Sequence, residues 1–119
     1  EKGNIVISDR YFDSTLAYQG AARKINLNII DTITRFATFG LIPTVTFLID
    51  LPPETGLARI NKADADRLEK ESLEFHRKVR EGFLKIAKRE KRFIVIDGTK
   101  TIAEIRQIIT EKIEQMLGR

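Results

Sequence analysis

Three short apolar runs constrain the fold of this chain more than any other feature. They are rich in Ile, Val and Phe, and they cover residues 4–8, 44–49 and 92–96. An aspartate follows each run directly, at Asp9, Asp50 and Asp97. Nearly continuous apolar runs of this length are typical of strands buried on both faces of a parallel sheet. Ligands gather at the carboxyl ends of such strands, so the three aspartates mark where a functional site is expected.

Helical patterns fill the gaps between the apolar runs. Asn26 can cap a helix that stops at Gly40, and Pro52-Pro53-Glu54 opens a second helix, where proline fits the first turn. A long third helix has an apolar face made of Leu68, Phe75, Val79, Phe83 and Ile86. A fourth begins with a capping box formed by Thr101 and Glu104. Because strands alternate with helices, the sequence predicts an α/β fold.

The composition removes several classes of function. The 119 residues include no Cys, which rules out disulfides, thiolate metal sites and a Cys nucleophile, and a single His does not support a His-based zinc site. No apolar run approaches the roughly 20 residues that span a bilayer, so we expect no membrane segment and a cytoplasmic setting. The net charge of +4 suits an anionic ligand at least as well as nucleic acid.

The segment that follows the first apolar run carries the most specific signal. From Asp9 to Gly20 it reads DRYFDSTLAYQG. This segment resembles the thymidylate kinase family, whose members carry DR[YH], a serine and an AYQG-like stretch at the same spacing. The resemblance continues over residues 49–57, 66–75 and 97–99. A bare Asp-Arg-Tyr would be a weak signal, but twelve residues in register after an apolar run are a strong one.

The chemistry of this segment is consistent with nucleotide binding without the family name. A carboxylate such as Asp9 can hold a water of Mg2+, and the planar fork of Arg10 suits a phosphate. Four polar side chains could line one wall of a nucleoside pocket if the segment is helical: Ser14, Thr15, Tyr18 and Gln19. Taken singly, each of these residues fits a structural role in an ion pair or a core. Their order as a group favours the pocket.

The resemblance assigns a reaction and roles to these residues. It implies transfer of the γ-phosphoryl group of ATP to dTMP, with Mg2+ and without a covalent intermediate. By the same resemblance, Arg10 contacts the dTMP phosphate, and Thr15 and Gln19 approach the thymine. The Tyr18 ring would crowd the ribose 2′ position and favour deoxynucleotides, and Asp9 would serve the metal.

A second group of residues is implied on the ATP side. Its members are Arg59, Arg67, Gly98 and Thr99. Residues 59–71 resemble the family's lid over ATP, and the implied catalytic cations are Arg10, Lys62 and Arg67. Family members often place several arginines between the positions of Arg59 and Arg67, whereas this chain has only Lys62 there. The decisive cation is therefore open between Lys62 and an arginine of a phosphate loop, and an ordinary solvated helix face is the alternative for the whole segment.

The phosphate loop itself is not found in the sequence. No G-x-x-x-x-G-K-[ST] occurs among the 119 residues, although the family carries that motif in its N-terminal part. Three buried strands also make a thin sheet. We therefore expect a P-loop nucleoside monophosphate kinase-like fold that is incomplete here, with residues 1–119 as one piece from its C-terminal portion and inactive alone.

Partners and alternatives complete the expectations. The helix after Asn26 has apolar residues on more than one side, and the resemblance implies a homodimer through it; simple packing on the sheet is the alternative. A basic run of Lys85, Lys88, Arg89, Lys91 and Arg92 is read as a solvated helix end rather than a nucleic-acid patch. The rival functions are a related kinase with another acceptor and a non-enzymatic basic module that binds nucleic acid.

Overall fold

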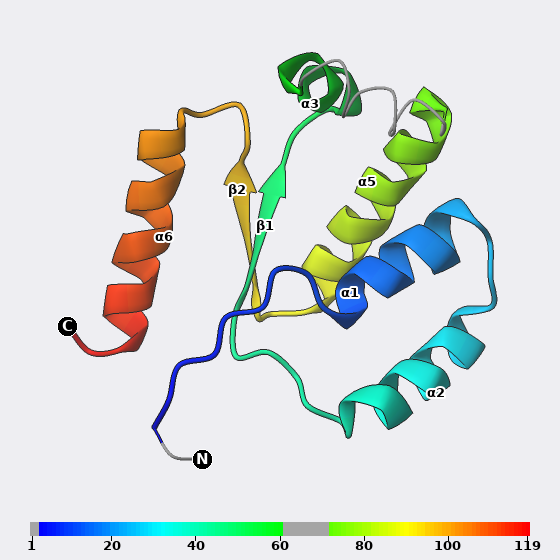
Figure 1. The fold of residues 1–119 in the computed structure, drawn as a ribbon, viewed down its shortest axis with the longest axis horizontal. Helices are drawn as coiled ribbons and strands as arrows, with labels where there is room; N and C mark the ends of the chain where they lie inside the picture. Colours follow the sequence, from blue (N-terminus) through cyan, green and yellow to red (C-terminus); the bar gives the residue numbers. More distant parts are fainter. Residues whose placement is uncertain (1–2, 61–71) are drawn as a thin grey trace.

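A two-stranded parallel sheet lies at the centre of the molecule (Figure 1). The structure is a computed structural model, and it describes residues 3–60 and 72–119. Strands β1 (Thr46–Asp50) and β2 (Phe93–Asp97) pair in parallel from Thr46↔Phe93 to Asp50↔Asp97. The α/β class and the direction of these two strands are confirmed, and Asp50 and Asp97 end at the same edge of the sheet.

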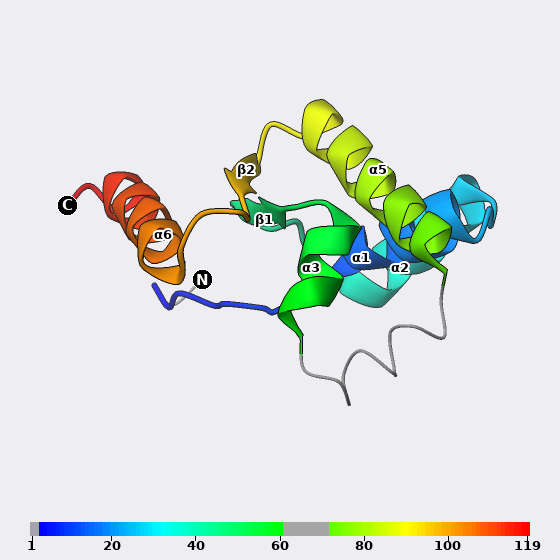
Figure 2. The same ribbon diagram turned by 90° about the horizontal axis from the view of Figure 1, so that it is seen from above.

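Two long helices lie on opposite sides of the strands, as Figures 1 and 2 both show. Helix α5 (Leu73–Arg89) begins at Ser72, whose side chain accepts a hydrogen bond from the Phe75 N–H at 3.1 Å. Helix α6 (Ile102–Met116) begins with the capping box that the sequence predicts. The Thr101 N–H donates to the Glu104 carboxylate at 2.8 Å, and the Glu104 N–H donates to the Thr101 hydroxyl at 3.2 Å.

The motif segment forms one helical rod that packs along α5. The rod consists of a short α-helix, α1 (Phe12–Thr15), which continues as the π-helical η1 (Leu16–Ala22). Its contact with α5 is the hydrophobic core, in which Ala17, Val79 and Ile86 are buried. Partly buried side chains surround them: Leu16, Tyr18, Phe75, Phe83 and Phe93. The motif is therefore helical, which is the condition under which its polar side chains could line a pocket wall.

The two remaining helices begin where the sequence predicts. Helix α2 (Leu27–Thr38) is capped by Asn26, whose side chain accepts from the Asn28 N–H at 2.9 Å. It ends at Phe39 in a left-handed conformation, and the Gly40 N–H closes the last turn on the Arg35 carbonyl at 3.1 Å. Helix α3 (Pro53–Arg59) follows β1 and has proline in its first turn.

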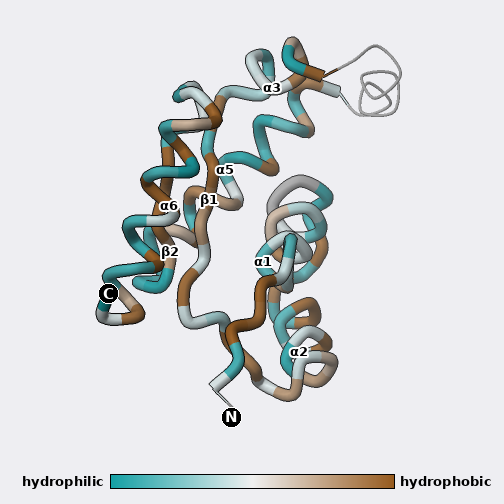
Figure 3. Tube along the Cα trace, turned by 60° about the vertical axis from the view of Figure 1, so that its left-hand side comes forward, coloured by the Kyte–Doolittle hydropathy of each residue, from teal (hydrophilic) through white to brown (hydrophobic). Residues whose placement is uncertain are grey.

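The prediction of a buried first strand is wrong for this structure. Residues 4–8 form no strand, and the side chains of Ile5, Val6 and Ile7 are 66%, 87% and 86% exposed. Figure 3 shows this stretch as an apolar segment leading into α1. Burial on both faces is also wrong for the other two runs, because Ile49 and Val95 are about half exposed. A strand exists only through its neighbours, and the described residues give 4–8 no strand to pair with.

The reading of Arg92 as part of a solvated helix end is also wrong. Helix α5 ends at Arg89, three residues earlier, and the Arg92 side chain is only 10% exposed. It donates to the carboxylate of Asp13, which is 7% exposed, through two hydrogen bonds of 2.8 Å. A buried arginine is stable only when its charge is paired in this way. None of the helices in the described ranges is long and apolar enough to cross a membrane.

Candidate functional site

Arg10 and Tyr18 lie in contact at the start of the motif. The guanidinium Nη2 of Arg10 donates a hydrogen bond to the Tyr18 hydroxyl at 3.1 Å. The Cζ atom of the same guanidinium lies 5.2 Å from the centre of the Tyr18 ring. The Arg10 backbone has a φ of 66°, in the left-handed region that non-glycine residues seldom occupy. The Ser8 hydroxyl supports this conformation by donating to the Arg10 carbonyl at 2.8 Å. The structure therefore brings together the two residues predicted to bind an acceptor phosphate and its sugar.

The Tyr18 ring is held by two phenylalanines of α5. Its centre lies 6.0 Å from that of Phe75 and 6.3 Å from that of Phe83, with the second pair nearly perpendicular. Edge-to-face packing of this kind fixes the plane of an aromatic ring. The ring thus has an apolar side against α5 and a polar end that points to Arg10.

The other predicted acceptor-side residues lie on the same rod as Tyr18. Thr15 is exposed, whereas Ser14 and Gln19 are partly buried. Thr15 ends α1, whereas Tyr18 and Gln19 lie in the π-helical η1, where the α-helical spacing of three and four residues no longer decides which side chains share a side. The Gln19 carbonyl accepts from the Ile25 N–H at 2.9 Å, so the backbone that carries Gln19 is anchored.

Asp9 is the one predicted metal-binding residue. It is exposed and directly precedes Arg10. In the part of the chain that the structure describes, no three His, Asp or Glu side chains gather into a metal site. Mg2+ does not require such a cluster, because it keeps several waters and binds through one or two carboxylates together with substrate phosphates. A single exposed carboxylate next to an arginine that is predicted to bind phosphate therefore fits Mg2+ carried by a nucleotide.

Three of the predicted ATP-side residues also lie together. The Arg59 guanidinium donates from Nη1 to the Gly98 carbonyl at 2.6 Å and from Nη2 to the Thr99 carbonyl at 3.4 Å. Gly98 itself approaches β1 closely, since its N–H donates to the Asp50 carbonyl at 2.7 Å. A Cβ added to Gly98 would lie 2.9 Å from that carbonyl oxygen, so only glycine fits.

Asp97 fixes the turn that follows β2. Its Oδ1 accepts hydrogen bonds from the Thr99 hydroxyl at 2.6 Å and from the Thr99 N–H at 2.9 Å. These bonds, the hydroxyl bond first, hold the pKa of the Asp97 carboxyl below its usual range because they stabilise the charged form. Lys62 and Arg67 lie outside the described residues, so the structure says nothing of their roles.

Comparison with known proteins identifies the family. The family model described as thymidylate kinase matches residues 1–109. A thymidylate kinase of Carboxydothermus hydrogenoformans is 58% identical over 106 residues, which cover 88% of this chain and 52% of that protein. The chain belongs to the thymidylate kinase family.

Two further members of the family show how far the likeness extends. A thymidylate kinase of a Sulfurihydrogenibium species is 53% identical and covers 97% of this chain and 56% of its own length. One from a Geobacillus species is 46% identical and covers 98% and 58%. The chain therefore spans slightly more than half the length of these curated relatives.

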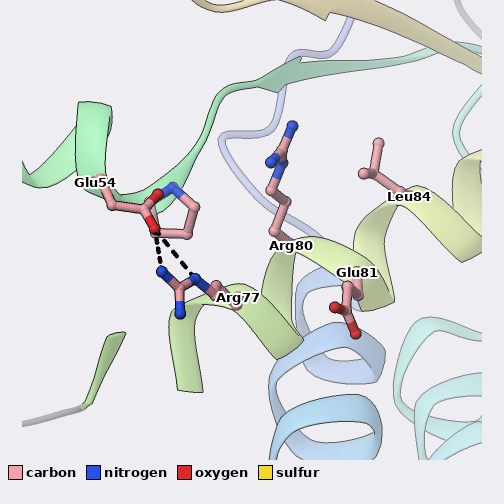
Figure 4. Close-up of a pocket in the computed structure, with 6 residues that line it drawn as sticks. Glu54, Arg77, Arg80, Glu81 and Leu84 are labelled. Atoms are coloured by element: carbon pink, nitrogen blue, oxygen red, sulfur yellow. Dashed lines mark hydrogen bonds and ion pairs between the residues drawn. The ribbon is translucent and has the colours of Figure 1, made fainter. Parts of the chain in front are cut away.

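Sequence reasoning missed two arginine–carboxylate pairs, whose arginines line a pocket between α3 and α5 of this thymidylate kinase chain together with Glu54 (Figure 4). Arg77 donates to Glu54 from Nε at 3.1 Å and from Nη2 at 2.5 Å. Arg80 donates to both oxygens of Asp50, at 2.8 and 3.0 Å, and these bonds raise the pKa of Arg80. Both guanidinium groups are thus already neutralised by carboxylates. The two pairs join α5 to the end of β1 and the start of α3. Neither arginine is left with an unpaired positive charge that could bind an anion in the pocket.

No local signal could have revealed these pairs. The partners are 23 and 30 residues apart, and each is an ordinary charged residue on a helix or at the end of a strand. The start of α3 gives one partial hint, because carboxylates are favoured at the first turn of a helix. The pKa of Glu54 is lowered first by a backbone N–H of that turn and then by Arg77.

We predict that Thr99→Val raises the pKa of Asp97 toward its ordinary value, because the substitution removes the hydroxyl that donates to the carboxylate. Thr99→Ser keeps that hydroxyl and should leave the pKa low. Carboxyl titration by NMR measures both variants. Since the native pKa is lowered, the hydrogen-bonded turn adds stability at pH values above the unfolded-state pKa and loses it as the pH falls through the native one. Equal pKa values in the two variants would contradict this account of the turn.

Proposed function

We propose that the protein containing this chain is a dTMP kinase, which transfers the γ-phosphoryl group of ATP to dTMP and yields dTDP and ADP. A phosphate oxygen of dTMP attacks the γ-phosphorus, and the bond to the β,γ-bridging oxygen breaks. The observation that carries this proposal is the contact of Arg10 with Tyr18 in a chain of the thymidylate kinase family. This contact places a guanidinium that can bind a phosphate next to an aromatic ring that can pack against a sugar. No specific observation favours another acceptor or a nucleic-acid ligand.

On the acceptor side, Arg10 binds the phosphate and Tyr18 packs against the sugar. Thr15 and Gln19 face the thymine, and Ser14 completes the wall of the pocket. The rigid mounting of the Tyr18 ring on Phe75 and Phe83 supports this role, because a fixed ring can exclude a 2′-hydroxyl. The hydrogen bond from Arg10 would exchange for bonds to phosphate when the nucleotide binds.

On the ATP side, Arg59, Gly98 and Thr99 form the surface for the adenine. Arg67 and Lys62, in the lid segment 59–71, would neutralise charge on the transferring group as Arg10 does from the other substrate. The hydrogen bonds from Arg59 to the carbonyls of residues 98 and 99 support the first part of this assignment. Rate comes from alignment of two anions and from charge neutralisation, without a covalent intermediate.

Mg2+ and the remaining phosphate contacts complete the proposed machinery. Asp9 would hold a water of a Mg2+ that neutralises phosphate charge when ATP is bound. The 119 residues contain no G-x-x-x-x-G-K-[ST] motif. We therefore propose that residues 1–119 are the C-terminal portion of a P-loop kinase domain that acts in the cytoplasm. The P-loop would belong to another portion of the same protein.

The acceptor range tests the function directly. With the full-length protein, steady-state rates are measured with ATP, Mg2+ and each of dTMP, dUMP, thymidine, UMP and CMP. We expect dTMP to have the highest kcat/KM, with UMP and CMP strongly disfavoured because Tyr18 crowds their 2′-hydroxyl. Preference for a ribonucleotide or for thymidine would refute the proposed substrate.

Replacement of Arg10 separates the two substrates. We expect Arg10→Ala to cost about 2–4 kcal/mol of transition-state binding, or roughly 30- to 1,000-fold in kcat/KM for dTMP, because a bidentate phosphate contact is lost. The KM for ATP should change little. Arg89→Ala removes the same charge from an exposed position on α5 and should alter neither constant. Equal losses for dTMP and ATP in the Arg10 variant would argue against its assigned role.

We also propose that the protein is a homodimer that pairs through α2. The helix and the turn after it expose an apolar surface: Leu27, Ile29, Ile33, Phe36, Phe39, Leu41 and Ile42. Phe36 and Phe39 are 86% and 96% exposed, and Ile29 and Ile33 line a shallow groove with Asn28 and Thr32. Several large apolar side chains exposed on one helix and the turn after it favour burial against a second copy.

We predict that Phe36→Glu converts the dimer to a monomer, because the substitution would bury a carboxylate in an apolar interface. Sedimentation of the full-length protein over a range of concentrations measures the change. Ile102→Glu places the same charge on an apolar residue of α6 that is 79% exposed, and it should leave the dimer intact. Persistence of the dimer in the Phe36 variant would exclude this interface.

A further inference from the structure

The Asp13–Arg92 pair connects the motif rod to the opening residues of both strands. Arg92 donates two parallel hydrogen bonds of 2.8 Å to Asp13 in the first turn of α1. Its Nη1 also donates to the Thr46 hydroxyl at 2.7 Å, where β1 begins. Arg92 itself directly precedes β2. One guanidinium therefore ties three elements that are distant in sequence.

The pair is far more enclosed than the other arginine–carboxylate pairs described above. Its two side chains are 10% and 7% exposed, against 36% and 19% for Arg80 and Asp50. The guanidinium also lies over the rings of Phe12 and Phe93, at 5.2 and 4.8 Å from their centres. Its Nε is buried without a hydrogen-bond partner among the described residues. The enclosed guanidinium is therefore held in one position, because a shift would leave its buried charge without a partner.

The pair lies at the end of the strands opposite to the one where ligands are expected. Thr46 and Phe93 open the two strands, whereas ligands of parallel sheets bind at the carboxyl ends, here at Asp50 and Asp97. Asp13 lies five residues before Tyr18 on the same helical rod. Asp13 can therefore affect the acceptor site only by changing the position of the rod that carries Tyr18.

The apolar packing of the rod leaves one degree of freedom that the pair removes. Phe75 and Phe83 fix the plane of the Tyr18 ring, whereas the aliphatic contact of Ala17 with Val79 has little directional preference. Such contacts set how close the rod lies to α5, but they resist sliding along it only weakly. A bidentate arginine–carboxylate contact is directional and fixes position along the rod. The position of Tyr18, and of the Arg10 guanidinium bonded to it, thus depends on Asp13.

We propose that Asp13 and Arg92 are positioning residues for the acceptor nucleotide, which set the place of Tyr18 and Arg10 by fixing the rod against the sheet. The inference rests on the proposed dTMP kinase activity. By this inference the Asp13–Arg92 pair, although outside the site, affects the binding of dTMP and not that of ATP. The ATP-side turn at residues 97–99 is held by its own bonds to Asp50 and Arg59 and does not depend on the rod.

The test uses Asp13→Asn in the full-length protein, which keeps the shape of the side chain but places an amide N–H against an arginine donor. We expect kcat/KM for dTMP to fall by roughly 10- to 100-fold, since misplacement of about 1 Å at a site has effects of that size. The Kd of dTMP from calorimetry should rise in parallel, while the KM for ATP stays within about twofold. Glu54→Gln weakens the half-exposed Arg77–Glu54 pair, which joins α3 to α5, and should leave the dTMP constants unchanged.

A second variant guards against misfolding. Arg92→Lys keeps the charge but cannot form two parallel bonds, so we expect a smaller loss that is again confined to dTMP. The double variant should lose little more than Asp13→Asn alone, because both substitutions break one linkage. Equal losses for dTMP and ATP, or folded variants with unchanged dTMP constants, would overturn the inference. An unmodified protein that fails to phosphorylate dTMP would instead refute the proposed function.

Discussion

The contact between the motif rod and α5 is the interaction on which the rest of the structure depends. Ala17 is fully buried in it, and its small side chain lets the two helices approach closely. Tyr18 is the next residue, so the same contact that forms the core also orients the ring proposed to face the sugar. Folding and site formation are thus one event on this side of the molecule. A larger residue at position 17 would push the rod and the pocket wall away from α5 together.

Paired charges then fix what apolar packing leaves free. The Asp13–Arg92 pair joins the rod to the sheet, whereas the Asp50–Arg80 and Glu54–Arg77 pairs join α5 to β1 and α3. Their energetic weight follows their exposure. Loss of one partner from the buried pair should cost about 3–5 kcal/mol, while the half-exposed Glu54–Arg77 pair contributes about 1 kcal/mol or less. The most enclosed pair is therefore the one best suited to hold a distance precisely enough for binding.

Elements that are specified by adjacent residues were predictable from the sequence, and elements that depend on distant partners were not. Asn26 and the Thr101–Glu104 capping box mark helix starts through hydrogen bonds within one turn, and the prolines before Glu54 mark one through their fixed backbone angle; all three starts are confirmed. The run at residues 4–8 has the composition of a strand, but pairing is not encoded within the run itself. Arg92 shows the same limit for burial, since the four residues before it are charged and its partner Asp13 is 79 residues away.

The candidate site divides along the same line. Arg10 and Tyr18 are eight residues apart in one motif, so their proximity could be expected once the segment was read as helical. The contact of Arg59 with residues 98 and 99 spans about 40 positions, and only the family resemblance pointed to it. Its bonds end on backbone carbonyls, which every residue type presents. What the sequence does encode there is Gly98, because the 2.7 Å approach to Asp50 admits no side chain. In this chain the glycine after β2 therefore fixes how closely the turn at residues 97–99 approaches the end of β1.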